Sequence, residues 1–221
     1  EGIERQFNSA EANRQLRRLR RRGPDRSTRL LIDVVRRALD EADVHDASLL
    51  DIGAGIGAIH HELLDGRVTR AVHVDASTAH VAAAREETER RGHGGRVEFV
   101  RNDFVAVESS VRSAEVVTLD RVICCYPDMD RLVGASARKA ERFYGAVYPR
   151  AVPWTRIGVA AVNLVQRVRR SAFRVFVHDP ARIDAVLRAS GLERAVKRTT
   201  LGWEVVLYER SAPARAPAAA G

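Results

Sequence analysis

The chain alternates between two hydrophobic periods along most of its length. Short apolar runs, typical of buried strands, alternate with segments whose apolar residues recur every three to four positions, typical of amphipathic helices. The short runs predict strands at residues 48–52, 68–75, 96–100, 114–120 and 145–149. The helical spacing predicts helices at residues 9–22, 26–41, 57–65, 77–92, 104–112, 128–143 and 179–191. This alternation indicates an α/β fold with a parallel sheet covered by helices on both faces.

The C-terminal third departs from this alternation. Residues 192–200 and 202–210 are two strand-like segments with only a tight turn between them, which predicts an antiparallel hairpin. Residues 153–176 are too long for an ordinary connection and predict an amphipathic helix followed by a short segment. Residues 211–221 are rich in Ala and Pro, and we expect them to be disordered.

Composition is that of a globular protein with a basic bias. The 221 residues are most simply one domain, and the net charge of +8 comes almost entirely from Arg, because only Lys139 and Lys197 are lysines. Residues 14–26, RQLRRLRRRGPDR, concentrate this charge. They are either a phosphate-binding segment or a solvated helix face. The second interpretation is favoured, because no aromatic residues are interleaved to stack on bases.

Several classes of protein find no support. No apolar run approaches the roughly 20 residues that a membrane-spanning helix needs, so we expect no membrane partner. Cys124 and Cys125 are adjacent and no C-x-x-C is present, which favours a reducing, cytoplasmic location. The scattered histidines, with His60 and His61 expected to point two ways from one helix, lack zinc-ligand spacing, and we expect no metal.

A glycine-rich loop, LLDIGAGIGAIHHELL at residues 49–64, joins the first predicted strand to a helix. Gly53, Gly55 and Gly57 allow a ligand to approach the backbone, beside the unpaired N–H groups of a helix N-terminus. The loop fits both G-x-G-x-x-[GA], the dinucleotide fingerprint, and acid-x-G-x-G-x-G, the S-adenosylmethionine loop. Either template expects an acid after the second strand to hold ribose hydroxyls, and Asp75 is there.

Three features favour the second template. Asp51 would sit poorly beside a pyrophosphate but suits the ammonium of a methionine moiety. Asp103, in RNDF after the third strand, can accept a hydrogen bond from an adenine amino group while Phe104 covers the ring. The Tyr-x-x-x-Lys pair of short-chain dehydrogenases is missing, because no tyrosine has a lysine four residues later.

With these motifs the chain resembles the class I S-adenosylmethionine-dependent methyltransferases over roughly residues 26–210. The resemblance implies a Rossmann-like, doubly wound sheet of seven strands in the order 3-2-1-4-5-7-6, with strand 7 antiparallel. Within the superfamily, VVTLDRVICCYPD and FRVFVHDPARIDAVLRASG are loosely similar to the branch that contains magnesium-protoporphyrin O-methyltransferase. The implied domains are a basic helical extension or lid at 1–25, a methyltransferase domain at 26–210 and a tail at 211–221.

The resemblance also implies roles for individual residues. The backbone of the three glycines would line the methionine moiety, with Asp51 organising the loop, and Asp75 would hold the ribose. Asn102, Asp103 and Phe104 would bind adenine. Asp120, at the end of the fourth strand, would lie near the transferring methyl group, unless it serves only as an ion-pair partner of Arg121 or as a cap.

The predictions for the part of the site that binds the methyl acceptor depend on fewer residues. Tyr126 directly follows the fourth strand, where nucleic-acid amino methyltransferases carry the motif (Asn/Asp)-Pro-Pro-aromatic. In this chain the residues at that place are Tyr-Pro-Asp, with one proline, which weakens the match to that motif. His178 is either a catalytic base or a structural histidine. We expect Tyr126 and His178 to be catalytic and, together with Trp154 and Phe173, to contact substrate. Phe7 and the arginine cluster would lie on the lid.

The sequence therefore predicts a cytoplasmic enzyme that uses S-adenosylmethionine, with S-adenosylhomocysteine as product. Its acceptor is expected to be a small molecule, with O-methylation slightly favoured. Two alternatives stay open: an RNA methyltransferase that uses the arginine-rich helix, and a protein that binds S-adenosylmethionine without transferring its methyl group. The oligomeric state is not predicted.

Overall fold

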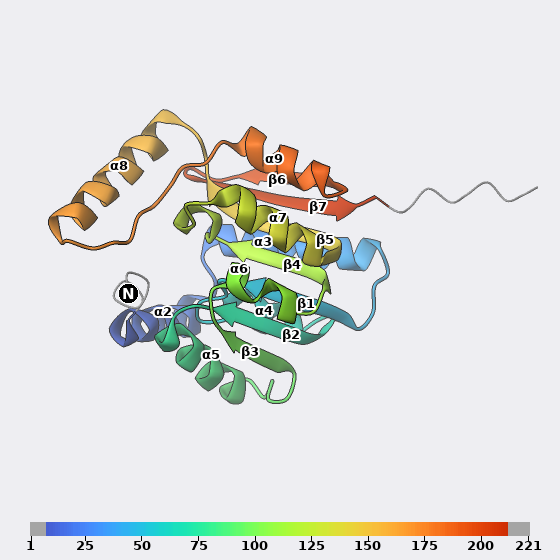
Figure 1. The fold of residues 1–221 in the computed structure, drawn as a ribbon. Helices are drawn as coiled ribbons and strands as arrows, with labels where there is room; N and C mark the ends of the chain where they lie inside the picture. The colour runs from blue at the N-terminus through green and yellow to red at the C-terminus, as the bar shows by residue number, and fades with distance from the viewer. Residues whose placement is uncertain (1–7, 212–221) are drawn as a thin grey trace, which may run out of the picture.

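A computed structural model describes residues 8–211 of the chain (Figure 1). Its centre is one seven-stranded sheet in the order β3-β2-β1-β4-β5-β7-β6, as expected. The strands are β1 Ala47–Ile52, β2 Val68–Asp75, β3 Val97–Arg101, β4 Ala114–Asp120, β5 Ala140–Pro149, β6 Leu192–Thr199 and β7 Trp203–Arg210. β7 runs antiparallel to both β5 and β6, and the other pairs are parallel. The predicted fold class is confirmed.

Helices cover both faces of the sheet and extend beyond it. They are α2 Ser9–Arg22, α3 Arg26–Glu41, α4 Ala58–Leu64, α5 Thr78–Arg90, α6 Phe104–Val107, α7 Met129–Lys139, α8 Pro153–Val168 and α9 Pro180–Ala189. One core cluster joins the strands to α3 and α4, and a second joins them to α6, α7 and α9. A third, small cluster packs α2 against the glycine loop and α5. In Figure 1, α8 stands away from this layered body.

The main departure from the predicted elements is the boundary between α7 and β5. A helix was expected to run to residue 143, but α7 ends at Lys139 and β5 begins at Ala140. Phe143 pairs with Val116 of β4 and with Glu209 of β7. Backbone pairing on both sides of a central strand outweighs the helical spacing of the sequence, which carries no information about those partners.

Smaller differences concern helix ends and side-chain directions. α2 is capped by Asn8, just before the predicted start of the helix, and the Asn8 side chain accepts from the Glu11 N–H at 3.1 Å. The helix expected at 104–112 is divided into α6 and a 3₁₀ turn at Glu108–Ser110. His60 and His61 do not point apart: both are fully buried, and their ring centroids lie 4.2 Å apart.

None of the helices within residues 8–211 is long and apolar enough to cross a membrane. Phe7, the first residues of the predicted lid and all but the first residue of the predicted tail lie outside the described residues.

Candidate functional site

A cavity of about 630 Å³ opens at the carboxyl ends of β1, β2 and β4. Ligands of open α/β sheets bind at this edge, where the strand order reverses. Its wall includes most of the predicted cofactor residues: Asp51, Gly53, Gly55, Asp75, Asn102, Asp103, Phe104 and Asp120. From α2 it includes Glu11, Gln15, Arg18 and Leu19, and from the C-terminal half Val162, Gln166, Phe173, Val175 and Trp203.

The glycine loop has the backbone that the sequence suggested. Gly53, Gly55 and Gly57 have φ values of 61°, 57° and 83°, in the region that side-chain-bearing residues rarely adopt. A Cβ on Gly53 would collide with the side chain of Val122, which follows β4. A Cβ on Gly55 would meet only the His80 Nδ1, at an ordinary contact distance of 3.9 Å. Gly57 caps α4 and is not part of the cavity wall.

Asp51 lies at the floor of the loop, with 1% of its surface exposed. One carboxylate oxygen accepts from the Thr118 hydroxyl at 2.8 Å, and the other lies 3.3 Å from the His60 Nδ1. Burial raises the pKa of Asp51 to about 7. Asp51 thus joins β1, β4 and α4 below the loop.

Asp75 ends β2 and faces the same loop. Its Oδ2 accepts from the Gly55 backbone N–H at 2.8 Å, and its Oδ1 accepts from the Ser77 N–H at 2.7 Å. A carboxylate oxygen can accept more than one hydrogen bond. The carboxylate, which lines the cavity, can therefore position the glycine loop and accept further hydrogen bonds from a ligand.

Asn102, Asp103 and Phe104 follow β3 on the next side of the cavity. The Asp103 carboxylate caps α6 by accepting from the Val105 N–H at 3.0 Å, and it also accepts from the Tyr126 hydroxyl at 3.1 Å. Phe104 is buried against the second core cluster, with 4% exposed. Tyr126 therefore touches the predicted adenine residues.

Asp120 is both a cavity residue and an ion-pair partner of Arg121. The Thr28 hydroxyl donates to its Oδ2 at 2.6 Å, and two Arg121 nitrogens lie 3.1 Å from its oxygens. Burial raises the pKa of Asp120, whereas Arg121 and Thr28 oppose that rise. The ion pair that was the alternative to a ligand role is present, and it lies in the cavity wall.

Arg121 holds this network together from an unusual backbone conformation, with φ of 61°. Its guanidinium also pairs with Asp25, the N-cap of α3, and lies over the Trp203 ring at 5.8 Å from the ring centroid. A non-glycine residue in this region is strained and often marks a functional site. Sequence reasoning missed Asp25 and Thr28, because they meet Arg121 only through contacts more than 90 residues apart.

The predicted acceptor residues are spread over two places. Phe173 and Tyr126 line the cavity, but Trp154 and His178 do not. Trp154 is 52% exposed and donates to the Leu201 carbonyl at 3.1 Å. The His178 Nε2 lies 3.0 Å from the Tyr126 carbonyl oxygen, and its ring stacks on Phe176. In this structure His178 supports the segment that carries Tyr126.

Burial and the neighbouring Asp103 carboxylate raise the pKa of the Tyr126 hydroxyl. Tyr126 is consequently protonated at neutral pH, where it donates a hydrogen bond rather than accepting a proton.

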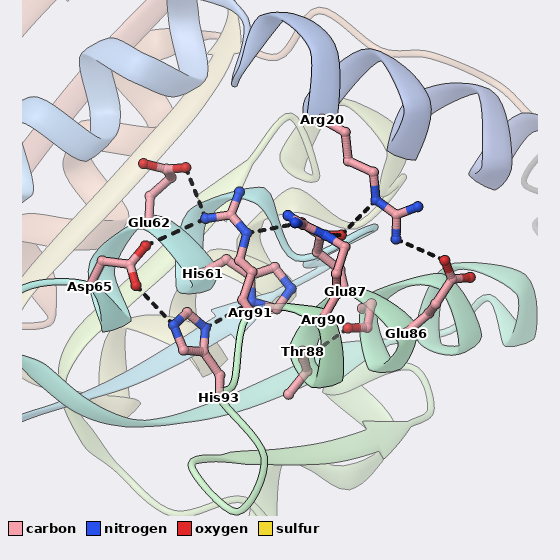
Figure 2. A network of polar contacts seen from close by, with 11 residues as sticks. Arg20, His61, Glu62, Asp65, Glu86, Glu87, Thr88, Arg90, Arg91 and His93 are labelled. Carbon is pink, nitrogen blue, oxygen red and sulfur yellow. Dashed lines mark hydrogen bonds and ion pairs between the residues drawn. The ribbon is translucent and has the colours of Figure 1, made fainter.

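Helix α2 forms one wall of the cavity and is anchored to α5 by an ion-pair network (Figure 2). Arg20 donates to Glu86 at 2.7 Å and to Glu87 at 2.8 Å. Glu87, whose side chain is fully buried, also accepts from Arg90 and Arg91, and these arginines lower its pKa. Part of the arginine cluster is therefore structural. Within residues 8–211 no cluster of His, Cys, Asp and Glu has a metal-binding arrangement.

Comparison with known proteins agrees with this geometry. Residues 49–140 match the protein family described as "Methyltransferase domain". No curated protein gives a significant sequence match to the chain. Among solved structures, magnesium protoporphyrin IX methyltransferase from Synechocystis PCC 6803, with bound S-adenosylhomocysteine, superposes with a TM-score of 0.73 at 17% identity, covering 95% of this chain and 98% of that chain.

Two further structures show how widely the fold is used. An O-methyltransferase family protein from Burkholderia thailandensis has a TM-score of 0.72 at 17% identity, covering 95% of this chain and 63% of that chain. A [4+2]-cyclase has a TM-score of 0.61 at 14% identity, covering 83% of this chain and 80% of that chain. At these identities the likeness establishes the fold alone.

Proposed function

We propose that this chain, which has the fold of class I methyltransferases and a methyltransferase domain at residues 49–140, transfers a methyl group from S-adenosylmethionine to a small organic acceptor, with oxygen as the favoured atom. The observation that carries the proposal is the convergence of the glycine loop, Asp75 and Asp103 on one cavity. These residues come from three strands and match the needs of a nucleoside attached to an amino acid.

The cavity wall fits the donor at several points. Gly55 lines the cavity and has no side chain, so a ligand there can approach its backbone. Asp75 would accept from the ribose hydroxyls, while it keeps the Gly55 N–H in place through the 2.8 Å bond. Asp103 and Asn102 would bind the adenine edge, beside the buried Phe104. Asp51, which is 1% exposed and accepts from Thr118, would mainly stabilise the loop from below, although it also belongs to the cavity wall.

S-adenosylmethionine, when bound, supplies an electrophilic methyl group on a sulfonium. The residues of this chain would act mainly by holding the acceptor in line with that methyl group in a space that excludes water, and positioning can lower a barrier by several kcal/mol. The network of Asp25, Thr28, Asp120 and Arg121 would fix the end of β4 beside the reacting centre. Tyr126, which is protonated at neutral pH, would orient groups by hydrogen bonding.

Arg18 is the feature of the cavity wall that favours an anionic oxygen acceptor, in a wall that also carries six carboxylates: Glu11, Asp25, Asp51, Asp75, Asp103 and Asp120. Two arginines line the cavity, and Arg121 is already paired with Asp25 and Asp120. Arg18 forms no ion pair with any residue in the described range 8–211, so it can attract an anionic acceptor. A carboxylate arrives ionised and needs no catalytic base. The apolar side chains of Val162, Phe173 and Val175 would surround the body of such an acceptor.

The test is methyl transfer from isotopically labelled S-adenosylmethionine to matched sets of small aromatic carboxylates, phenols and amines, detected by mass spectrometry. We expect labelled methyl esters or ethers, and a lower kcat/KM for carboxylates in Arg18→Ala than in Arg17→Ala, which removes the same charge from the exposed side of α2. Transfer to amines alone would exclude O-methylation, and equal losses in the two variants would exclude the role of Arg18.

The same assay separates the remaining alternatives. Donor binding without transfer to any acceptor class would favour a binding protein or another reaction on this fold. Transfer to RNA, with binding that weakens steeply as salt rises, would favour an RNA substrate instead.

A further inference from the structure

Helix α8 turns polar side chains toward the protein and apolar side chains toward the solvent, which is the reverse of an ordinary surface helix. Its polar residues Asn163 and Gln166 are half-buried, and none of its 16 residues is fully buried. Asn163 bonds twice to the following segment: its amide donates to the Val175 carbonyl at 2.7 Å, and its oxygen accepts from the Val175 N–H at 2.9 Å. Polar contacts thus attach the helix to the protein, and its apolar face is left outward.

The outward face is a continuous apolar stripe, which we call the α8 ridge. Its members recur at i, i+3, i+7, i+10, i+11 and i+14, which places them on one side of a helix: Trp154, Ile157, Ala161, Leu164, Val165 and Val168. Ile157 is 70% exposed, Leu164 60% and Val168 76%. Large apolar side chains gathered in this way on a surface mark an interaction site.

The charge around the ridge has a single sign. Residues 142–178 contain no Asp or Glu, and arginines lie along α8 and just beyond its C-terminus. Arg156, Arg167, Arg169 and Arg170 are exposed, and none of them forms an ion pair within the part of the chain that the structure describes. An apolar stripe flanked by unpaired arginines is the pattern of helices that lie in the headgroup region of a membrane.

We propose that the α8 ridge docks on the surface of an anionic lipid bilayer. A helix of 16 residues is too short to span the hydrocarbon core, but it can lie in the interface with its apolar side inserted. The arginines would then meet lipid phosphates, which lower the free energy of the bound state. A second copy of the chain fits less well, because apposed ridges would bring segments of the same charge together.

Docking in this orientation has a consequence for the cavity. Val162 and Gln166 of α8 line its wall, as do Phe173 and Val175 of the segment that α8 holds. A docked ridge would therefore hold the cavity close to the lipid surface, where apolar small molecules accumulate.

The experiment is co-sedimentation of the full chain with phosphatidylcholine vesicles, with and without phosphatidylglycerol. We expect binding to the anionic vesicles, little binding to phosphatidylcholine alone, and weaker binding as salt rises. Ile157→Glu/Leu164→Glu should lower the partition coefficient by about tenfold or more, because two carboxylates oppose both insertion and charge attraction. Ala181→Glu/Ala185→Glu, at exposed positions of α9, adds the same charge and should bind as the unchanged chain does.

Both variants should unfold at the temperature of the unchanged chain, because all four positions are exposed. Equal loss in the two variants, or equal binding to both kinds of vesicle, would overturn the proposal. Light scattering provides the other decisive outcome: if the ridge variant converts a dimer to a monomer and no vesicle binding occurs, the ridge is a contact between copies. Methyl transfer is not required for any of these readouts, so the docking proposal and the proposed function fail separately.

Discussion

Gly53 and Gly55 have the same backbone conformation but different surroundings. Both have positive φ, which costs any residue with a Cβ about 1–2 kcal/mol. A Cβ on Gly53 would also collide with the Val122 side chain, whereas a Cβ on Gly55 would be in ordinary contact with His80. Overpacking of this kind adds about 1–3 kcal/mol.

We therefore expect Gly53→Ala to lower the free energy of unfolding by about 1–3 kcal/mol more than Gly55→Ala does. Chemical denaturation of the two variants measures the difference. Equal losses would mean that the contact between the loop and Val122 does not constrain the glycine.

The His73 side chain is completely buried next to Phe99 and His60, and neither ring nitrogen has a hydrogen-bond partner among the described residues. Burial holds its pKa well below the ordinary value. In the unfolded chain His73 takes up a proton below about pH 6.5, but in the folded chain it stays neutral, so its contribution to stability falls as pH falls.

His73→Phe removes the titratable ring, and with it the loss of stability that protonation of the unfolded chain causes. From pH 7 to pH 5 the unchanged chain should lose about 2 kcal/mol of stability relative to the variant, whatever their difference at pH 7. Urea unfolding at the two pH values measures this change. A difference that does not vary with pH would show that His73 is able to ionise in the folded protein.

The sequence places a residue in space where its position along a strand determines which edge of the sheet it reaches. Asp75 and Asp120 end strands, so parallel pairing brings them to the same edge of the sheet. Asp25 and Thr28 do not lie at strand ends, so the sequence did not predict that they reach the site. Their importance comes from Arg121, and that contact depends on how α3 packs across the sheet.

At the scale of elements, α2 is the part whose interpretation changes most. Its arginines were expected to form a solvated face, with phosphate binding as the alternative, on a helix that could act as a lid. Arg20 instead connects α2 to α5 through Glu86 and the buried Glu87. Ala12, Leu16 and Leu19 add an apolar contact. The adjacent face of α2, which shares Leu19 with this contact, lines the cavity, so the attachment of α2 to α5 should influence donor binding.

Arg20→Ala should weaken the binding of S-adenosylhomocysteine severalfold, because α2 loses its ion pairs to α5. Arg17→Ala is the matched control: it removes the same charge from an exposed position on the same helix. Isothermal titration calorimetry compares the two. If both variants bind as the unchanged chain does, the ion pairs do not help to shape the cavity.

Sequence patterns specified most elements but not all their ends. The period of α8 was visible, yet the direction in which its apolar face points was not, because that depends on Asn163 bonding to Val175. The end of α7 was misplaced by four residues, from 143 to Lys139, because sheet pairing through Phe143 determines it.

At the scale of the whole molecule, the strand order could be predicted only through a family resemblance. Local periodicity distinguishes strands from helices, but it contains no information about which strands are neighbours. The resemblance supplied that order, and the sheet has it. The order in turn brings the ends of β1, β2 and β4 around one cavity, where residues as distant in sequence as Glu11 and Trp203 share a wall.

We propose that this cavity binds the methyl donor through Asp75. Calorimetric titration with S-adenosylhomocysteine measures this binding, with Asp75→Ala beside Glu98→Ala, an exposed carboxylate on the adjacent strand β3. We predict one-to-one binding that Asp75→Ala weakens by about tenfold or more, since charge-assisted hydrogen bonds are lost, and that Glu98→Ala leaves unchanged. No binding at millimolar ligand, or equal affinity in the Asp75 variant, would mean that the cavity does not hold the donor through Asp75.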